Sequence, residues 1–209
     1  MTYRSLIASL RLLRNHARIG KVTIGHVLDT LGEAGFCLIA LFLALPFLQP
    51  FIPLGPFSTA GGLAFIMLGT QILRGFPEPI LPERLRCIAV TPRILQGIIG
   101  YSIKFLGWCR RYTRLRYLNW VSWHKGRTLM GGILLASGLI MVIPFFGIPL
   151  NDFFPALAIV SVCIAELEQD GLMVLVALGW LIVGAVYCTS LIVLLAMFGH
   201  EAFSFFLGA

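Results

Sequence analysis

The sequence predicts an all-α membrane protein: two proline-broken, re-entrant helical hairpins related by an internal repeat, a final transmembrane helix and interfacial amphipathic helices. Of the 209 residues, 58% are hydrophobic and only 12% are charged, whereas soluble domains carry roughly 25% charged residues. Runs without Asp, Glu, Lys or Arg span 34–73, 128–151 and 171–200, and a spanning helix needs about 20 apolar residues. Prolines interrupt the first two runs, which prevents one continuous helix through either.

Residues 1–33 are expected to form basic amphipathic helices at the membrane interface. At helical spacing, one side carries Leu6, Leu10, Leu13 and Ala17, and an adjacent side carries Arg4, Arg11, Arg14 and Arg18. This pattern is typical of helices that lie among lipid headgroups. A frayed basic tail is the alternative. The arginines leave no unbroken apolar stretch, so a cleavable signal peptide is not expected. A short helix is expected over Thr23–Leu31.

The first broken hairpin is predicted over 34–75, with helices over Ala34–Leu45 and Phe57–Leu73. The prolines that break it are Pro46, Pro50, Pro53 and Pro56. The first helix would be about 18 Å long, too short for a hydrocarbon core of about 30 Å. Basic residues flank the run on both sides, so we expect both ends on one face and the tip near the bilayer midplane.

Residues 76–127 are expected to form a basic amphipathic connector at the cytoplasmic surface. All 16 Lys and Arg lie within 1–127, and basic residues near spans mark the cytoplasmic side. The N-terminus and 104–127 are therefore placed in the cytoplasm, against anionic lipid headgroups rather than nucleic acid. The stretch 87–108 either crosses the membrane, as the repeat favours, or lies flat, as its charges favour.

The second broken hairpin, over 128–170, shares the plan of the first. Its breaking prolines are Pro144, Pro149 and Pro155. The Ile-Pro-Leu tripeptides at 52–54 and 148–150 are 96 positions apart, as are the glycines that end the second helices, Gly75 and Gly171. Duplicated broken helices are typical of transporters, which bind substrates at the breaks. Alternatively, the breaks only let two hairpins pack closely.

The helix after the second break is expected over Phe153–Gln169. The final spanning helix is then expected over Leu172–Phe198, within the segment 171–209. Asp170 is its predicted N-cap, because an Asp side chain can accept hydrogen bonds from the first free backbone N–H groups of a helix.

Polar residues at and near the breaks are the candidate substrate- or ion-binding groups. They are Gln49, Ser58, Thr59, Gln71, Asn151, Asp152 and Glu166. Ser58 or Thr59, and Asp152, also occupy positions where N-caps belong, which is their alternative role. Helix N-termini at the breaks would favour an anion, whereas Asp152 favours a cation or a proton. Glu166 is either a coupling carboxylate within the membrane or an interfacial acid paired with an arginine such as Arg74.

The sequence predicts neither an enzyme nor a bound metal or cofactor. The five cysteines and four histidines are isolated, without the spacing of metal ligands or redox pairs. It contains no nucleophile elbow and no phosphate-binding glycine loop.

Five motifs belong together as a pattern. They are Leu31-Gly32-Glu33, Ala44-Leu45-Pro46 with the prolines that follow, Gln71 with Gly75, Asn151 to Ala156, and Glu168 to Gly171. This pattern, from Thr23 to about Phe198, resembles the ExoD family of bacterial membrane proteins associated with exopolysaccharide synthesis. Asp152 and Phe154 depart from it. The resemblance implies a multi-pass protein of the bacterial inner membrane with a role in exopolysaccharide synthesis.

Together, the breaks and the resemblance predict a small transporter or flippase for an anionic or lipid-linked envelope metabolite. One alternative is a proton- or cation-coupled transporter in pH homeostasis, which the acidic residues favour. Another is a non-catalytic scaffold that holds polysaccharide-synthesis enzymes through the basic stretch 104–127. The lipid bilayer is the expected partner in every case, and a homo-oligomer is compatible with the sequence.

Overall fold

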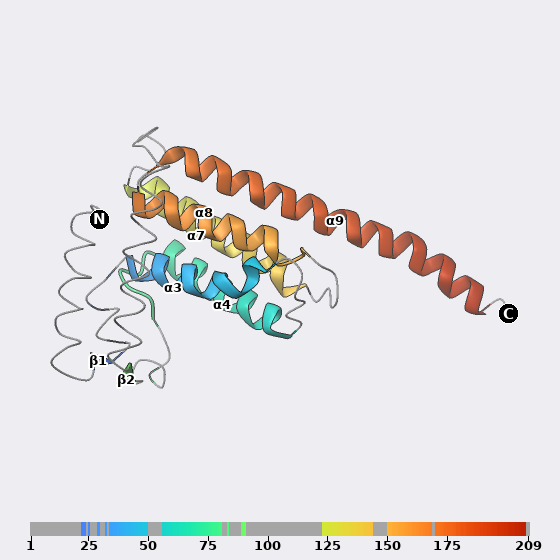
Figure 1. The fold of residues 1–209 in the computed structure, drawn as a ribbon, viewed down its shortest axis with the longest axis horizontal. Coiled ribbons are helices and arrows are strands. Elements are labelled where there is room, and N and C mark those ends of the chain that lie inside the picture. The colour runs from blue at the N-terminus through green and yellow to red at the C-terminus, as the bar shows by residue number, and fades with distance from the viewer. Residues whose placement is uncertain are drawn as a thin grey trace.

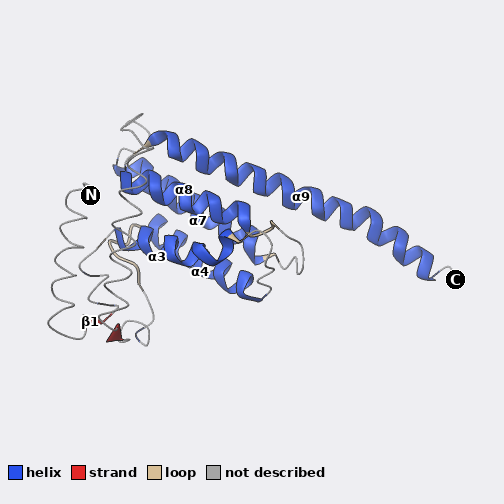
Figure 2. Ribbon diagram, viewed as in Figure 1, coloured by secondary structure: helices blue, strands red, loops and turns tan. Residues whose placement is uncertain are grey.

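A computed structural model shows an all-helical bundle and one very short strand pairing (Figures 1 and 2). The structure describes residues 22–23, 25, 29, 32, 34–49, 56–80, 83, 89–90, 123–143, 150–168 and 170–207. The helical elements are α3 (Ala34–Ala44), η1 (Leu45–Leu48), α4 (Pro56–Leu73), α7 (Trp123–Val142), α8 (Phe153–Glu168) and α9 (Gly171–Leu207). Strand β1 (Val22–Thr23) pairs antiparallel with β2 (Ala89–Val90).

Prolines set the helix boundaries at the first break. The predicted helix over Ala34–Leu45 is found as α3, which continues into the 3-10 turn η1. Pro46 lies at the start of η1 and Pro56 opens α4, positions where the missing N–H is not needed inside the helix. At the second break, the predicted helix over Phe153–Gln169 is found as α8.

Three segments differ from the expected elements. Val22–Thr23, placed among the N-terminal helices, forms β1, and Ala89–Val90 of the connector forms β2. This pairing joins segments far apart in the chain, and β-branched residues such as Val and Thr favour strands. At Val22–Thr23, the strand pairing therefore outweighs the helical periodicity of the N-terminal segment. Helix α7 begins at Trp123 rather than at 128. The predicted boundary followed the charges, but Lys and Arg are good helix formers and extend the helix.

Helices α4 and α7 pack backbone against backbone. A Cβ atom added at Gly62 would lie 2.8 Å from the carbonyl oxygen of Gly138, and one at Gly138 would lie 2.7 Å from that of Gly62. Further along, a Cβ at Gly69 would lie 2.8 Å from the carbonyl oxygen of Gly131. Small residues allow such close approach of helices in a membrane. These contacts follow opposite orders along the two helices, so α4 and α7 are antiparallel.

At one end of the bundle, here the charged end, lie Gly75, Arg127, Glu168 and Asp170. Helix α4 ends there because Gly75 has a φ of +80°, and the N–H of Phe76 donates to the carbonyl of Gln71 at 3.2 Å, a Schellman motif. Arg127 donates to the carbonyl of Phe76. Asp170 Oδ1 accepts the N–H of Leu172 at 3.0 Å, which confirms that it caps the final helix.

The opposite end, here the break end, is where α3 and α7 finish and α4 and α8 begin. Helices α3 and α7 therefore run toward the break end, and α4 and α8 run away from it. Helix α9 packs along α8 and continues well past the break end (Figure 1). The core contains Phe36, Phe65, Leu134, Met141 and Ile159, all fully buried.

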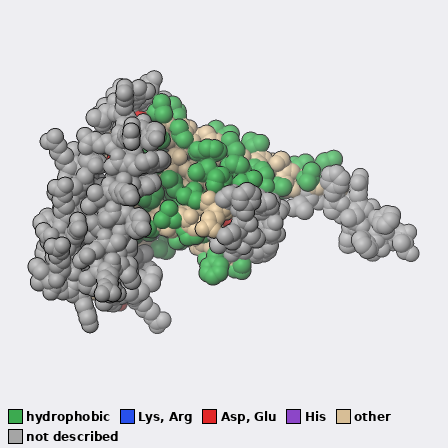
Figure 3. Space-filling view, viewed as in Figure 1, with side chains coloured by type: hydrophobic (Ala, Val, Ile, Leu, Met, Phe, Trp, Pro, Cys, Tyr) green, Lys and Arg blue, Asp and Glu red, His purple; other side chains and the backbone are tan. Residues whose placement is uncertain are grey.

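Two helices are long and apolar enough to cross a membrane: α4 and the part of α9 from Gly171 to Leu194. Hydrophobic side chains also cover most of the described surface on the face shown in Figure 3. These observations indicate a membrane protein. The 18 residues of α4 extend about 27 Å, against a hydrocarbon core of about 30 Å. The internal repeat and the midplane depth of the hairpin tips stay predictions.

Candidate functional site at the two helix breaks

A hydrogen bond joins the two helix breaks directly. Ser58, in the first turn of α4, lies with its Oγ 2.5 Å from Oδ1 of Asp152, in the turn before α8. The same Oγ lies 3.2 Å from the carbonyl oxygen of Met141, near the end of α7. The breaks, 94 residues apart in the chain, are therefore in contact.

Asn151 extends this contact to the final helix. Its amide Nδ2 donates to Asp152 Oδ1 at 3.2 Å, and its Oδ1 accepts from the thiol of Cys188 on α9 at 3.1 Å. The preceding residue, Leu150, has a φ of +68°, a left-handed conformation that costs a non-glycine residue roughly 1–2 kcal/mol. We call Ser58, Asn151, Asp152, Cys188 and the Met141 carbonyl the polar network.

Most of the polar network is shielded from solvent. Ser58 is 7% exposed, while Asn151 and Cys188 are 4% exposed each. Asp152 is half-buried and lies in a turn outside both candidate spanning helices. Burial raises the pKa of its carboxyl above the ordinary 3.8, while the hydrogen bonds from Ser58 and Asn151 lower it in part. Burial of an acid therefore favours its neutral form here.

The predicted capping roles hold only for the backbone of Asp152. Its carbonyl accepts the N–H of Ala156 at 3.1 Å, which puts Asp152 at the N-cap position of α8. Its carboxylate, however, meets Ser58. Ser58 is the third residue of α4, so it is not an N-cap. Its hydroxyl instead reaches across to α7 and to the second break.

Aromatic packing holds α9 beside the second break. The ring of Phe154 stacks on Trp180 with centroids 6.1 Å apart and makes a T-shaped contact with Tyr187 with centroids 5.6 Å apart. Gly184 faces Phe154 and the buried Pro155, where an added Cβ would lie 3.2 Å from the Phe154 Cβ. Such ring pairs contribute about 0.5–1.5 kcal/mol beyond the burial of area. These ring contacts hold α9 against the start of α8 and so keep Cys188 next to Asn151.

The remaining candidate residues lie elsewhere. Gln49 is exposed after η1, and Thr59 is half-buried on α4. Gln71 lies at the charged end, where its amide exchanges hydrogen bonds of 3.0 and 2.8 Å with the backbone of Ile80. Glu166 is 14 residues beyond Asp152 on α8, or about 21 Å along the helix. Four of the breaking prolines, Pro50, Pro53, Pro144 and Pro149, fall outside the described residues.

Two features, Cys188 in the polar network and the close-packed glycines of α4 and α7, were not predicted from the sequence. Cys188 lies within an apolar run, and nothing local distinguishes it from the other isolated cysteines. The close-packed glycines did leave a signal, because Gly62 and Gly69 are seven residues apart and so are Gly131 and Gly138. Small residues at such a repeat indicate a helix interface in a membrane.

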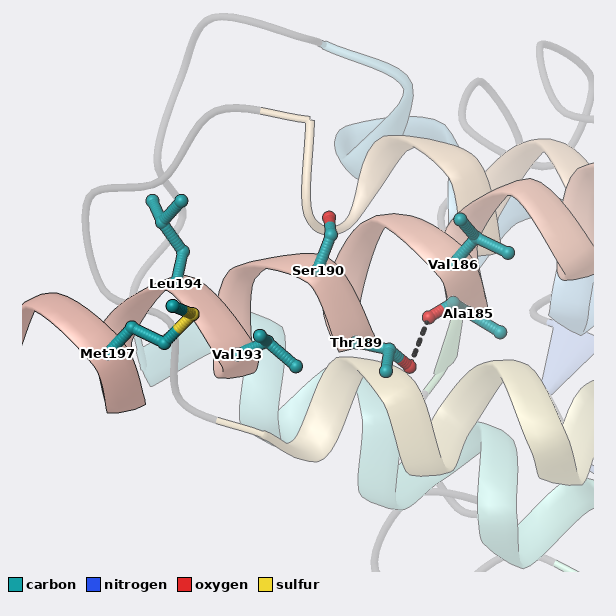
Figure 4. A pocket seen from close by; sticks show the side chains of 7 residues that line it. All are labelled: Ala185, Val186, Thr189, Ser190, Val193, Leu194 and Met197. Atoms are coloured by element: carbon teal, nitrogen blue, oxygen red, sulfur yellow. Dashed lines mark hydrogen bonds between the residues drawn. The ribbon is translucent and has the colours of Figure 1, made fainter.

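An open groove of about 510 Å³ lies along α9 (Figure 4), and its lining residues begin within one helical turn of Cys188. Its lining residues are Ala185, Val186, Thr189, Ser190, Val193, Leu194 and Met197. The two hydroxyls donate within the helix, from Thr189 to the Ala185 carbonyl at 2.8 Å and from Ser190 to the Tyr187 carbonyl at 2.7 Å. The groove therefore offers an apolar surface.

A family profile described as "Exopolysaccharide synthesis, ExoD" matches residues 6–190. The chain belongs to the ExoD family. It is 28% identical over 202 residues to "Protein ExoD" of Rhizobium meliloti (strain 1021). The aligned region covers 96% of this chain and 80% of that relative. No solved structure matches the chain. The ExoD match includes every residue of the polar network, and the family is linked to exopolysaccharide synthesis.

Proposed function

We propose that this ExoD-family protein is a small membrane transporter that serves exopolysaccharide synthesis, with the polar network as its substrate site. The Ser58–Asp152 hydrogen bond carries the proposal, because it joins the two breaks around buried polar groups. Irregular backbone in a membrane is tolerated where protein buries it or water reaches it. Transporters place their sites at such broken helices. The proposed activity involves no catalysis.

The surroundings of the network support an anionic, lipid-linked substrate. Helices α4 and α8 both begin at the network, and helix N-termini carry partial positive charge that attracts anions. The apolar groove on α9 starts at the same level and suits a hydrocarbon chain. We therefore propose an envelope metabolite with a negatively charged head and an apolar tail.

A second candidate function is proton or cation transport in pH homeostasis. The carboxyl group of Asp152, inside the network, favours it, because an ionised carboxylate repels an anionic substrate. Vesicles that hold the purified protein and a pH-sensitive dye distinguish the two. Proton flux without any defect in exopolysaccharide in the deletion strain supports pH homeostasis.

Complementation of a bacterial strain that lacks the gene tests the transport proposal. The wild type, Asn151→Ala and Gln49→Ala are expressed, and secreted exopolysaccharide and membrane abundance are measured. We expect the Asn151→Ala strain to secrete no exopolysaccharide although the membrane abundance of the protein is unchanged, because Asn151 links Asp152 to α9. Gln49→Ala, at an exposed residue outside the network, should match the wild type. Full exopolysaccharide from Asn151→Ala would contradict the proposal.

A further inference from the structure

The hydroxyl of Ser58 has one proton but two acceptors beside it. Its Oγ lies 2.5 Å from Asp152 Oδ1 and 3.2 Å from the Met141 carbonyl oxygen. A serine hydroxyl donates only one hydrogen bond, although it accepts others. An ionised Asp152 takes that donor and leaves the Met141 carbonyl without it. A protonated Asp152 donates to Ser58, whose hydroxyl then donates to Met141, so both contacts become hydrogen bonds.

We propose that Asp152 is a proton-binding site, and that its proton fastens α4 to α7 through Ser58. This inference rests on the proposed function, since the proton would be the coupling ion of that same site. The proton comes from solvent and returns to it, and no other covalent bond changes.

Among the described residues, the groups that face the Asp152 carboxyl carry no positive charge. They are Ser58 from α4, the Met141 carbonyl from α7 and the amide of Asn151. Behind Asn151 lies the thiol of Cys188 on α9, the other titratable group of the network. Of the side chains that the structure describes, the arginines lie at the charged end. A neutral, protonated carboxyl therefore suits these surroundings better than an unpaired carboxylate.

Protonation resolves the conflict between Asp152 and an anionic substrate. With Asp152 neutral, the helix N-termini of α4 and α8 leave the network favourable to an anion. With Asp152 ionised, its charge repels the same anion. Proton and anion therefore increase each other's affinity, since coupling between two bound ligands is reciprocal. The class of transport that follows is proton–anion symport.

Infrared titration of the full chain in lipid nanodiscs tests the proton site. A protonated carboxyl gives a C=O band distinct from that of a carboxylate. We expect the wild type to keep this band above pH 3.8, the ordinary Asp value, and Asp152→Asn to lack it. Glu83→Gln, which removes an exposed carboxyl, should keep it. The same band in Asp152→Asn, or no band in the wild type above that pH, would overturn the proposal.

Thermal unfolding gives a second, independent measurement. Burial raises the pKa of Asp152 in the folded state above 3.8, so ionisation costs the folded state more than the unfolded state. The cost is absent below pH 3.8 and grows as pH rises through the folded pKa. The Tm of the wild type relative to Asp152→Asn should therefore fall across that window. A pH-independent difference in Tm contradicts the proposal.

Failure of the proton site and failure of the transport function give different results. If Asn151→Ala loses exopolysaccharide but the infrared band does not depend on Asp152, transport stands and the proton site is overturned. If the band depends on Asp152 but both Asn151→Ala and Asp152→Asn secrete normal exopolysaccharide, the proton site stands and the transport function is overturned.

Discussion

Two buried serines in the bundle differ in whether their hydroxyls have partners. Ser58, 7% exposed, contacts the Met141 carbonyl and the Asp152 carboxyl. Ser137, in α7, is fully buried, and its Oγ has no hydrogen-bond partner among the described residues. A buried polar group without a partner costs about 1–3 kcal/mol, whereas a satisfied one contributes to stability. The same residue type therefore acts oppositely at the two positions.

We expect Ser58→Ala to lower the free energy of unfolding by about 1–3 kcal/mol, since it leaves Met141 and Asp152 without their shared partner. Ser137→Ala removes only an unsatisfied hydroxyl and should raise it by about 1 kcal/mol. Denaturant unfolding of both variants in detergent micelles measures the difference. Equal effects of the two substitutions would show that the hydrogen bonds of Ser58 do not stabilise the fold.

At the scale of elements, the α4–α7 pair determines where the first break lies relative to the second. Four glycines in matched positions bring the two backbones together, and this contact places Ser58 within reach of the end of α7. A side chain between the helices would separate them by the width of a methyl group. Because a backbone carbonyl cannot rotate away from such a methyl group, the helices themselves would have to move.

Gly138→Ala should destabilise the protein by about 1–3 kcal/mol, as overpacking of a close interface does, because its Cβ would lie 2.7 Å from the Gly62 carbonyl oxygen. Gly132→Ala is the matched control in the same helix: an added Cβ there meets nothing within 4 Å. It should be neutral or stabilising by up to about 1 kcal/mol, since Ala favours a helix. Thermal unfolding of the two variants compares them, and equal Tm values would argue against the glycine contact.

At the scale of the whole molecule, α9 is covered by the rest of the bundle along only part of its surface. Val186 and Met197 are 63% and 65% exposed, and the helix extends beyond the break end (Figure 1). Soluble monomers rarely expose apolar patches larger than a few hundred Å². Lipid chains are therefore the environment that this surface suits.

Val186→Lys tests that environment. In water, a charge at this exposed position would change stability by no more than about 0.5 kcal/mol. Near the centre of a spanning helix, a lysine costs about 2.5–3.5 kcal/mol. The amount of protein inserted in the membrane should therefore fall sharply. Leu172→Lys, in the first turn of α9, should be tolerated because a lysine at a helix end reaches the headgroups. Equal membrane abundance of the two variants would count against a spanning α9.

The sequence alone determined the properties that depend on neighbouring residues. The absence of charge over long runs indicated a membrane protein, and the prolines located the helix ends near Pro46 and Pro56, because both effects act on the local backbone. The cap at Asp170 and the glycine turn at Gly75 were predictable for the same reason. The motifs also indicated the ExoD family, which the family match confirms.

Only the tertiary structure decided which polar residues meet. It joined Ser58, Asn151 and Asp152 into one network and added Cys188 from α9, while it placed Gln71 and Glu166 toward the other end. It also paired β1 with β2 against the local helical pattern. These contacts link residues far apart in the chain. They depend on how closely two helices pack and on which sides face each other, and neither follows from the composition of any one segment.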